Sequence, residues 1–169
     1  MSKVAVIMTD LVEDIEVTSP KEALENAGHD MVIISEKDTV TGKKGTKFPV
    51  DTSIDGISWQ DFDALLIPGG FSPDQLRTDE RYVQLTKDFL ESHRPVFAIC
   101  HGPQIFIQTE LLPNLTLTGY ESILPDLMYA GATVRDQPVV IDHNLITSRN
   151  PGDLEAFNAA IVNALNEPT

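Results

Sequence analysis

Short apolar runs, each about the length of one strand, are the feature that most constrains the fold of this 169-residue chain. Segments with the apolar spacing of a helix separate them, and the clearest of these is Glu80–Ser92. Parallel strands need crossover connections of this kind, whereas antiparallel neighbours can be joined by tight turns. The pattern therefore predicts an α/β three-layer sandwich with a mainly parallel, flavodoxin-like central sheet. Its central strands are expected at Lys3–Met8, Asp30–Ser35, Ala64–Ile67 and Val96–Ile99.

The remaining segments fit the same architecture. One helix reaches Ala27; it begins either with Ser19 and Pro20, as cap and first residue, or some residues earlier. Residues 36–50 place glycines between β-branched residues, which predicts a hairpin away from the main sheet. Further short strands are expected at 116–118, 133–134, 139–141 and 145–147, and further helices at 120–130 and 153–165. Because 41% of the residues are hydrophobic, residues 1–169 are expected to form a single domain.

Charge and cysteine content argue against several functions. The 26 acidic and 12 basic residues give a net charge of −14, so nucleic acid is not expected as a primary partner. The basic cluster Lys43, Lys44 and Lys47 is interpreted as a solvated loop. A single cysteine and the absence of a long apolar segment favour a cytoplasmic protein without membrane association. The four histidines are scattered and no cysteines are paired, so neither a metal site nor a cofactor is expected.

The only cysteine, Cys100, directly follows the apolar run Val96–Ile99 and precedes His101 and a Gly-Pro pair that opens a helix. A strand that turns directly into a helix exposes the turn residue at the carboxyl end of the sheet. The positive end of the following helix would lower the pKa of a thiol there, as expected for a nucleophile. The alternative is a buried cysteine that acts only as a small hydrophobe.

Two other stretches follow predicted strands. Asp10–Glu13 comes after the first strand, and Gly69–Gly70 comes after Ala64–Ile67. Glycines at such a position let backbone N–H groups face a ligand, although a simple tight turn would use the same residues. Ligands of parallel sheets bind beyond the carboxyl ends of the strands. We therefore expect these stretches to form one site with Cys100.

The sequence resembles the PfpI family, a branch of the Parkinson-disease-protein superfamily. The resemblance covers essentially the whole chain. It rests on Ile-Pro-Gly-Gly before Ser-Pro-Asp, on Ala-Ile-Cys-His-Gly-Pro-Gln, on Glu13–Glu16 and on the late run Thr147–Leu154. Members have been described as intracellular cysteine proteases, general stress proteins, glyoxalase III or protein deglycases. The resemblance implies an enzyme with a cysteine nucleophile.

The resemblance also implies roles for individual residues. Cys100 would be the nucleophile, and Glu13 would lie beside its sulfur as a protonated carboxyl group. The backbone N–H groups of Gly70 and His101 would form an oxyanion hole, with His101 as general base and acid. Asp74 occupies the position of a carboxylate that orients the histidine of a neighbouring subunit, where the family often has glutamate. Gly69 and Tyr120 would contribute to substrate binding.

These roles fit attack by Cys100 on reactive carbonyls such as methylglyoxal, or on their adducts with damaged protein side chains. Attack on peptide carbonyls is a second possibility, and the protein would act as a homodimer or higher homo-oligomer. An alternative from another class is a redox-responsive or chaperone-like stress protein that senses oxidation through Cys100. A class I glutamine amidotransferase has a similar fold and nucleophile turn. It requires a late His-x-Glu motif, which the sequence around His143 lacks.

Overall fold

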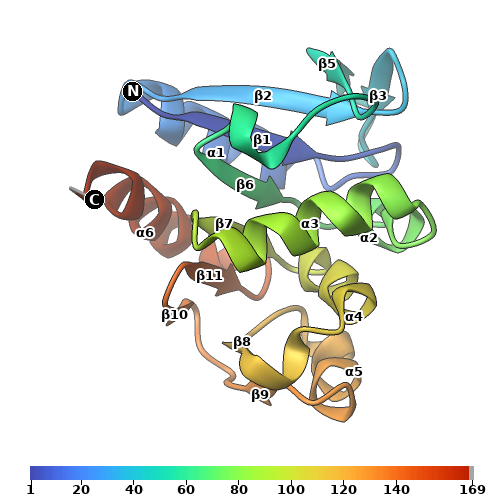
Figure 1. Cartoon of the computed structure of the whole chain (residues 1–169). Helices are drawn as coiled ribbons and strands as arrows, with labels where there is room; N and C mark the ends of the chain where they lie inside the picture. The colour runs from blue at the N-terminus through green and yellow to red at the C-terminus, as the bar shows by residue number, and fades with distance from the viewer. Residues whose placement is uncertain (168–169) are drawn as a thin grey trace.

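The fold is organised around one seven-stranded sheet in this computed structural model, which describes residues 1–167 (Figure 1). The strand order is β10-β11-β7-β6-β1-β2-β5; all neighbours are parallel except β10 and β11. The strands of this sheet are β1 (Lys3–Ile7), β2 (Asp30–Ser35), β5 (Thr52–Ser53), β6 (Ala64–Ile67), β7 (Val96–Ile99), β10 (Val140–Asp142) and β11 (Leu145–Ser148). Two small sheets pair β3 (Thr39–Thr41) with β4 (Lys47–Pro49) and β8 (Thr116–Leu117) with β9 (Thr133–Val134).

Helices cover both faces of the sheet, as Figure 1 shows for α3 on one side and α6 on the other. The α-helices are α1 (Ile15–Asn26), α2 (Ser72–Leu76), α3 (Glu80–Ser92), α4 (Ile105–Thr109), α5 (Leu124–Tyr129) and α6 (Leu154–Asn166). Short 3₁₀ turns are η1 (Trp59–Asp61), η2 (Gly102–Gln104), η3 (Leu112–Asn114), η4 (Glu121–Ile123) and η5 (Pro151–Asp153). The α1 helix packs on α6, and α3 packs on α4. The predicted α/β sandwich with a mainly parallel sheet is therefore confirmed.

Alternating side chains of the central strands build a hydrophobic core on each face. In β1, Val4 and Val6 point to the side of α1 and α6, where Phe157 is fully buried. Ala5 and Ile7 point to the opposite side, against α3 and its buried Phe89. Successive residues of a strand face opposite sides, and a strand covered on both faces reads as a continuous apolar run. This is why the central strands could be located in the sequence.

Two elements differ from the sequence-based expectation, and α1 decides between two alternatives that the sequence left open. The α1 helix begins at Ile15, the earlier of the two starts, so Pro20 lies inside it. The five-residue α2 helix after the glycine pair was not predicted. The expected helix over 120–130 consists of the turn η4 followed by the shorter α5, with Pro125 in the first turn of α5. Short helices of this kind offer too few turns for an apolar period to be recognised.

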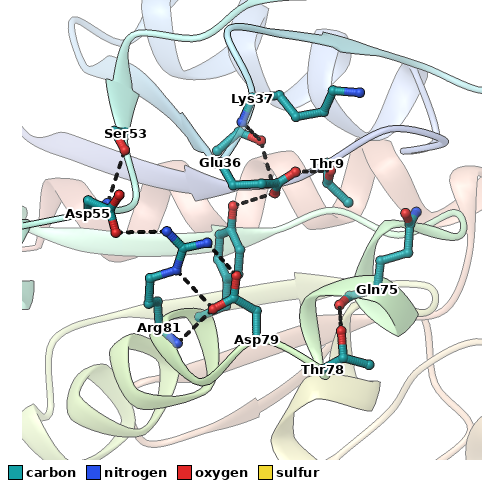
Figure 2. A network of polar contacts seen from close by, with 11 residues as sticks. Thr9, Glu36, Lys37, Ser53, Asp55, Gln75, Thr78, Asp79 and Arg81 are labelled. Atoms are coloured by element: carbon teal, nitrogen blue, oxygen red, sulfur yellow. Dashed lines mark hydrogen bonds and ion pairs between the residues drawn. The ribbon is translucent and has the colours of Figure 1, made fainter.

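A polar network ties the start of α3 to the ends of β1 and β2 (Figure 2). The Thr9 hydroxyl and the Tyr82 hydroxyl each donate a hydrogen bond of 2.7 Å to the Glu36 carboxylate. Nearby, Arg81 contacts Asp79 at 2.6 Å and Asp55 at 2.7 Å. The network anchors a core helix at the same edge of the sheet as Cys100, but it does not include the cysteine.

No helix within residues 1–167 is long and apolar enough to cross a bilayer. Over the same residues, no group of three or more His, Cys, Asp or Glu side chains is arranged to hold a metal ion.

Candidate active site

Cys100 forms a sharp turn between β7 and η2. Its φ of 62° lies in the left-handed region, which residues with a side chain rarely adopt. Backbone hydrogen bonds fix this conformation from both sides: the Cys100 N–H donates to Ser148 O at 3.1 Å, and the Tyr120 N–H donates to Cys100 O at 2.8 Å. The residue is only 7% exposed. The held, strained turn is typical of a functional position, and it places the sulfur at the carboxyl end of the sheet.

Gly69 and Gly70 lie directly against the cysteine. A Cβ on Gly69 would come within 2.9 Å of both the Cys100 Cβ and the His101 nitrogen. Gly70 has a φ of 75°, and a Cβ there would lie 2.5 Å from the Glu13 nitrogen and from Leu11 O. Both positions therefore exclude a side chain. The backbone N–H groups of His101 and Gly70 both act on the Cys100 sulfur and lower its pKa in part.

Glu16, not Glu13, is the carboxyl group beside the sulfur. Glu16 Oε1 accepts the Gly69 N–H at 2.8 Å. Its Oε2 is buried without a hydrogen-bond partner, and the carboxyl and the Cys100 thiol are close enough to shift each other's pKa. The expectation for Glu13 is therefore wrong. The reason is that α1 begins at Ile15, and its first turn carries Glu16 inward while Glu13 stays in the preceding loop.

Glu13 instead binds the β3–β4 hairpin. Its carboxylate contacts Lys44 Nζ at 3.0 Å and Lys43 Nζ at 3.2 Å. These two hydrogen-bonded lysines outweigh partial burial and lower the pKa of Glu13, so it is charged near neutral pH. Lys43 and Lys44 are thus not simply part of a solvated loop. No sequence pattern indicated this pairing, because 30 residues separate Lys43 from Glu13.

The pKa values of Glu16 and Cys100 are both raised. Burial raises the pKa of Glu16 to about 8, with a smaller contribution from the negative charge of Glu13. Burial also raises the pKa of Cys100 to about 12, and the negative charge of Glu16 adds to the shift. The lowered thiol pKa expected from the sequence is therefore wrong. The helix after the turn is only a 3₁₀ turn followed by five α-helical residues, and its dipole is too small to offset desolvation.

His101 points toward the sulfur. Its Nδ1 lies 3.4 Å from Cys100 Sγ, and its ring stacks on Tyr120 with centroids 4.8 Å apart and planes inclined by 23°. Burial and the positive charge of Lys43 lower the pKa of His101, and the charge of Asp74 partly opposes them. The imidazole is therefore neutral near pH 7, the form that accepts a proton. Asp74 is exposed on α2 and acts on His101 through its charge.

Asp14 fastens the tip of the β3–β4 hairpin to the loop that leads into α1. Its carboxylate accepts the backbone N–H of Lys44 at 2.9 Å and of Thr46 at 3.0 Å. Gly42 leaves the necessary room, because a Cβ there would lie 2.4 Å from an Asp14 carboxylate oxygen. The hairpin thus holds the segment that carries Glu16 into the site.

A family model described as DJ-1/PfpI family matches residues 2–164. The chain belongs to the DJ-1/PfpI family. This result confirms the resemblance found in the sequence. The site of this DJ-1/PfpI protein combines the predicted Cys100, His101, Gly69, Gly70 and Tyr120 with the unpredicted Glu16. Recognition of the helix start at Ile15 could have selected Glu16, which is fully buried in the first turn of α1.

Several relatives match almost the full length of this DJ-1/PfpI chain. "Putative cysteine protease YraA" of Bacillus subtilis is 53% identical over 165 residues, which cover 96% of this chain and 98% of the relative. General stress protein 18 of Bacillus subtilis is 52% identical over 160 residues, covering 92% and 93%. A two-domain protein from Anabaena variabilis with DJ-1/ThiJ/PfpI-like and ferritin-like domains superposes with a TM-score of 0.94 at 38% identity. That match covers 98% of this chain and 48% of the two-domain protein.

Proposed function

We propose that this protein is a cysteine-dependent enzyme that converts small reactive carbonyl compounds, with methylglyoxal as the test substrate. The observation that supports this most is the contact of 3.4 Å between His101 Nδ1 and Cys100 Sγ. A neutral imidazole at this distance can move protons on a substrate carbon attached to the sulfur. Glu16 supplies a second proton acceptor beside the thiol.

The first step forms the thiolate within the Glu16–Cys100 pair. Above about pH 8 this pair loses one proton, and the remaining proton can reside on the carboxyl group or on the sulfur. When the carboxyl group holds it, the sulfur attacks the aldehyde carbon of methylglyoxal. The C–S bond forms as the carbonyl π electrons move to oxygen, where the N–H groups of Gly70 and His101 stabilise the charge. Protonation of that oxygen gives a hemithioacetal.

His101 then transfers a proton between neighbouring carbons. Its Nδ1 removes the proton from the carbon bonded to sulfur, and the electron pair forms an enediolate with the adjacent ketone. Return of the proton to the former ketone carbon gives a thioester of lactate. Water hydrolyses the thioester, releasing lactate and the Cys100 thiol. The net reaction adds one water molecule to methylglyoxal and uses no cofactor.

Peptide hydrolysis is the second candidate, and the same contact between His101 and Cys100 supports it. The name of the relative YraA as a putative cysteine protease points in this direction. A peptidase must also protonate an amine leaving group, for which an oriented His101 is needed. A carboxylate from a second copy of the chain, Asp74, would provide that orientation in a homo-oligomer. The exposed position of Asp74 on α2 is compatible with such a contact.

A redox-responsive stress function is the remaining alternative. The name general stress protein 18 of a relative supports a role in stress without specifying the chemistry. Oxidation of Cys100 would require Glu16 to accept the thiol proton but would not require His101. The two functions therefore differ in their dependence on His101.

The deciding experiment measures lactate formation from methylglyoxal by the purified protein and by Cys100→Ala and His101→Ala at equal folded concentration. Loss of turnover in both variants is the expected result. Turnover that is absent in the unmodified protein, or independent of either residue, would contradict the proposal. Peptide substrates and mild peroxide, assayed with the same variants, would then separate the peptidase from the redox alternative.

A further inference from the structure

The tip of the β3–β4 hairpin carries an ammonium group to the edge of the candidate active site. Lys43 Nζ lies 3.2 Å from Glu13 Oε2 and 5.5 Å from the centre of the Phe71 ring. Phe71 directly follows Gly70 in the chain, and the Glu13 N–H donates to Gly69 O at 3.3 Å. Lys43 is therefore held beside the glycine turn that contacts Cys100.

The backbone of the hairpin fixes this position. The Lys43 N–H donates to Val12 O at 2.9 Å, and the Asp14 carboxylate accepts the next residue's N–H. The Lys43 side chain is 37% exposed, so its ammonium group is open to a ligand while its backbone is anchored. A flexible surface lysine would not have this constraint.

The charge of Lys43 reaches the reacting groups. It lowers the pKa of both Glu16 and His101. The net charge of the chain is −14, so a cation beside the nucleophile is a local exception to an acidic surface. The charge of Asp74 on α2 acts on His101 in the opposite direction.

The two lysines of the hairpin tip already bind one carboxylate, that of Glu13. Its carboxylate lies between Lys43 Nζ and Lys44 Nζ, so two ammonium groups face one carboxylate. The neighbouring Asp14 carboxylate is already engaged by two backbone N–H groups. A second anion that approaches from the sulfur could bind Lys43 while Lys44 keeps Glu13.

We propose that Lys43 is an anion subsite of the Cys100 site, and that the site prefers carbonyl compounds that carry a carboxylate or phosphate group. The preference for a carbonyl substrate rests on the proposed function. The subsite itself does not, because its effect on an anionic reagent at Cys100 requires no turnover.

The first test compares alkylation of Cys100 by iodoacetate and by iodoacetamide. Both reagents form an S–CH₂ bond and release iodide, and they differ in a carboxylate against a neutral amide of similar size. The ratio of the two rate constants therefore reports the electrostatic preference at the sulfur and cancels changes in thiol pKa. Lys43→Met is expected to lower this ratio about threefold, the size of effect that one nearby charge produces in a partly hydrated site.

Lys47→Met is the matched control, because Lys47 is on the same hairpin but its Nζ hydrogen-bonds Thr41 Oγ1 at 2.9 Å. Its ratio is expected to equal that of the unmodified protein. Complete alkylation of Cys100 by iodoacetamide in all three proteins verifies that the sulfur remains accessible. An unchanged ratio in Lys43→Met, or an equal fall in Lys47→Met, would overturn the subsite.

The second test addresses the substrate class through protection of Cys100 from iodoacetamide by aldehydes. The thiol adds reversibly to an aldehyde: sulfur bonds to carbon, and the thiol proton goes to oxygen. Succinic semialdehyde and butanal both carry a four-carbon chain, but only the former ends in a carboxylate. Succinic semialdehyde is expected to protect at a several-fold lower concentration, and Lys43→Met is expected to remove this advantage. Equal protection, or protection by neither aldehyde, would overturn the preference.

The two proposals fail separately. A ratio that depends on Lys43 without any methylglyoxal turnover would contradict the proposed function and leave the subsite in place. Methylglyoxal turnover with a rate ratio independent of Lys43 would contradict the subsite and support the proposed function.

Discussion

His101 Nδ1 lies 3.4 Å from Cys100 Sγ although the two residues are adjacent in the sequence. Neighbouring side chains on a regular helix or strand point in different directions. The left-handed φ of Cys100 turns the chain between β7 and η2 and brings the two side chains to one side. A thiol and an imidazole in contact are thus provided by a single dipeptide.

Replacement of Glu16 is expected to change the pH dependence of Cys100. In the unmodified protein, alkylation by iodoacetamide should rise through about pH 8, where the Glu16–Cys100 pair loses its first proton. Glu16→Gln removes the group that titrates near pH 8, so this inflection should disappear and the rate should keep rising at higher pH as the buried thiol ionises alone. Glu13→Gln is the control: it removes only the smaller contribution of the Glu13 charge to the pKa of Glu16, so the inflection should remain and move slightly to lower pH. If Glu13→Gln alone removed the inflection, the assignment to Glu16 would be wrong.

Glu16 should also make the free energy of unfolding depend on pH. Burial raises the pKa of Glu16 from 4.5 to about 8, so the folded state favours the protonated carboxyl group. This contribution is fully present below pH 4.5 and is lost as the pH rises to 8, because the unfolded chain releases the proton first. Glu16→Gln should therefore raise the free energy of unfolding at pH 7 by about 3 kcal/mol relative to the unmodified protein. Urea unfolding at pH 4 and pH 7 measures the difference; a gap that does not grow with pH would contradict the raised pKa.

Gly70→Ala is expected to destabilise the protein by about 3 kcal/mol or more and to abolish turnover. The new Cβ would lie 2.5 Å from backbone atoms of Leu11 and Glu13, which cannot move without displacing the loop before Glu16. Gly56→Ala is a matched control, because Gly56 has the same φ of 75° but no atom within 4 Å. That variant should show only the cost of backbone strain, about 1 kcal/mol. Thermal and urea unfolding of both variants, with methylglyoxal turnover, provide the comparison.

Tyr120 is expected to act on catalysis by positioning His101 through their stacked rings. Tyr120→Phe keeps the stack and should retain kcat within about twofold, whereas Tyr120→Leu should lower kcat about tenfold. KM should change little in both, because the ring contacts the imidazole. Steady-state kinetics with methylglyoxal separate the two parameters. A rise in KM with unchanged kcat would instead support a direct role in substrate binding.

The sheet could be predicted because its strands are buried on both faces and read as uninterrupted apolar runs, as in Ala64–Ile67 and Val96–Ile99. The glycine pair and the cysteine turn were also recognisable, because their backbone requirements restrict the residue type. The choice between Glu13 and Glu16 could not be made from the sequence. It depends on where α1 begins, and helix ends are poorly defined by sequence. The pKa of Cys100 depends on burial in the assembled core, which a local pattern does not reveal.

Because Asp14 links the site to the β3–β4 hairpin, the site can lose its structure when the hairpin unfolds, while the main sheet stays folded. The carboxylate of Asp14 joins the loop before Glu16 to backbone N–H groups of a small two-stranded unit that lies outside the main sheet. Such peripheral units open by local unfolding at a lower free energy than the core. Heating should therefore abolish the proposed methylglyoxal turnover below the temperature at which the sheet melts, and cooling should restore it as the hairpin closes again.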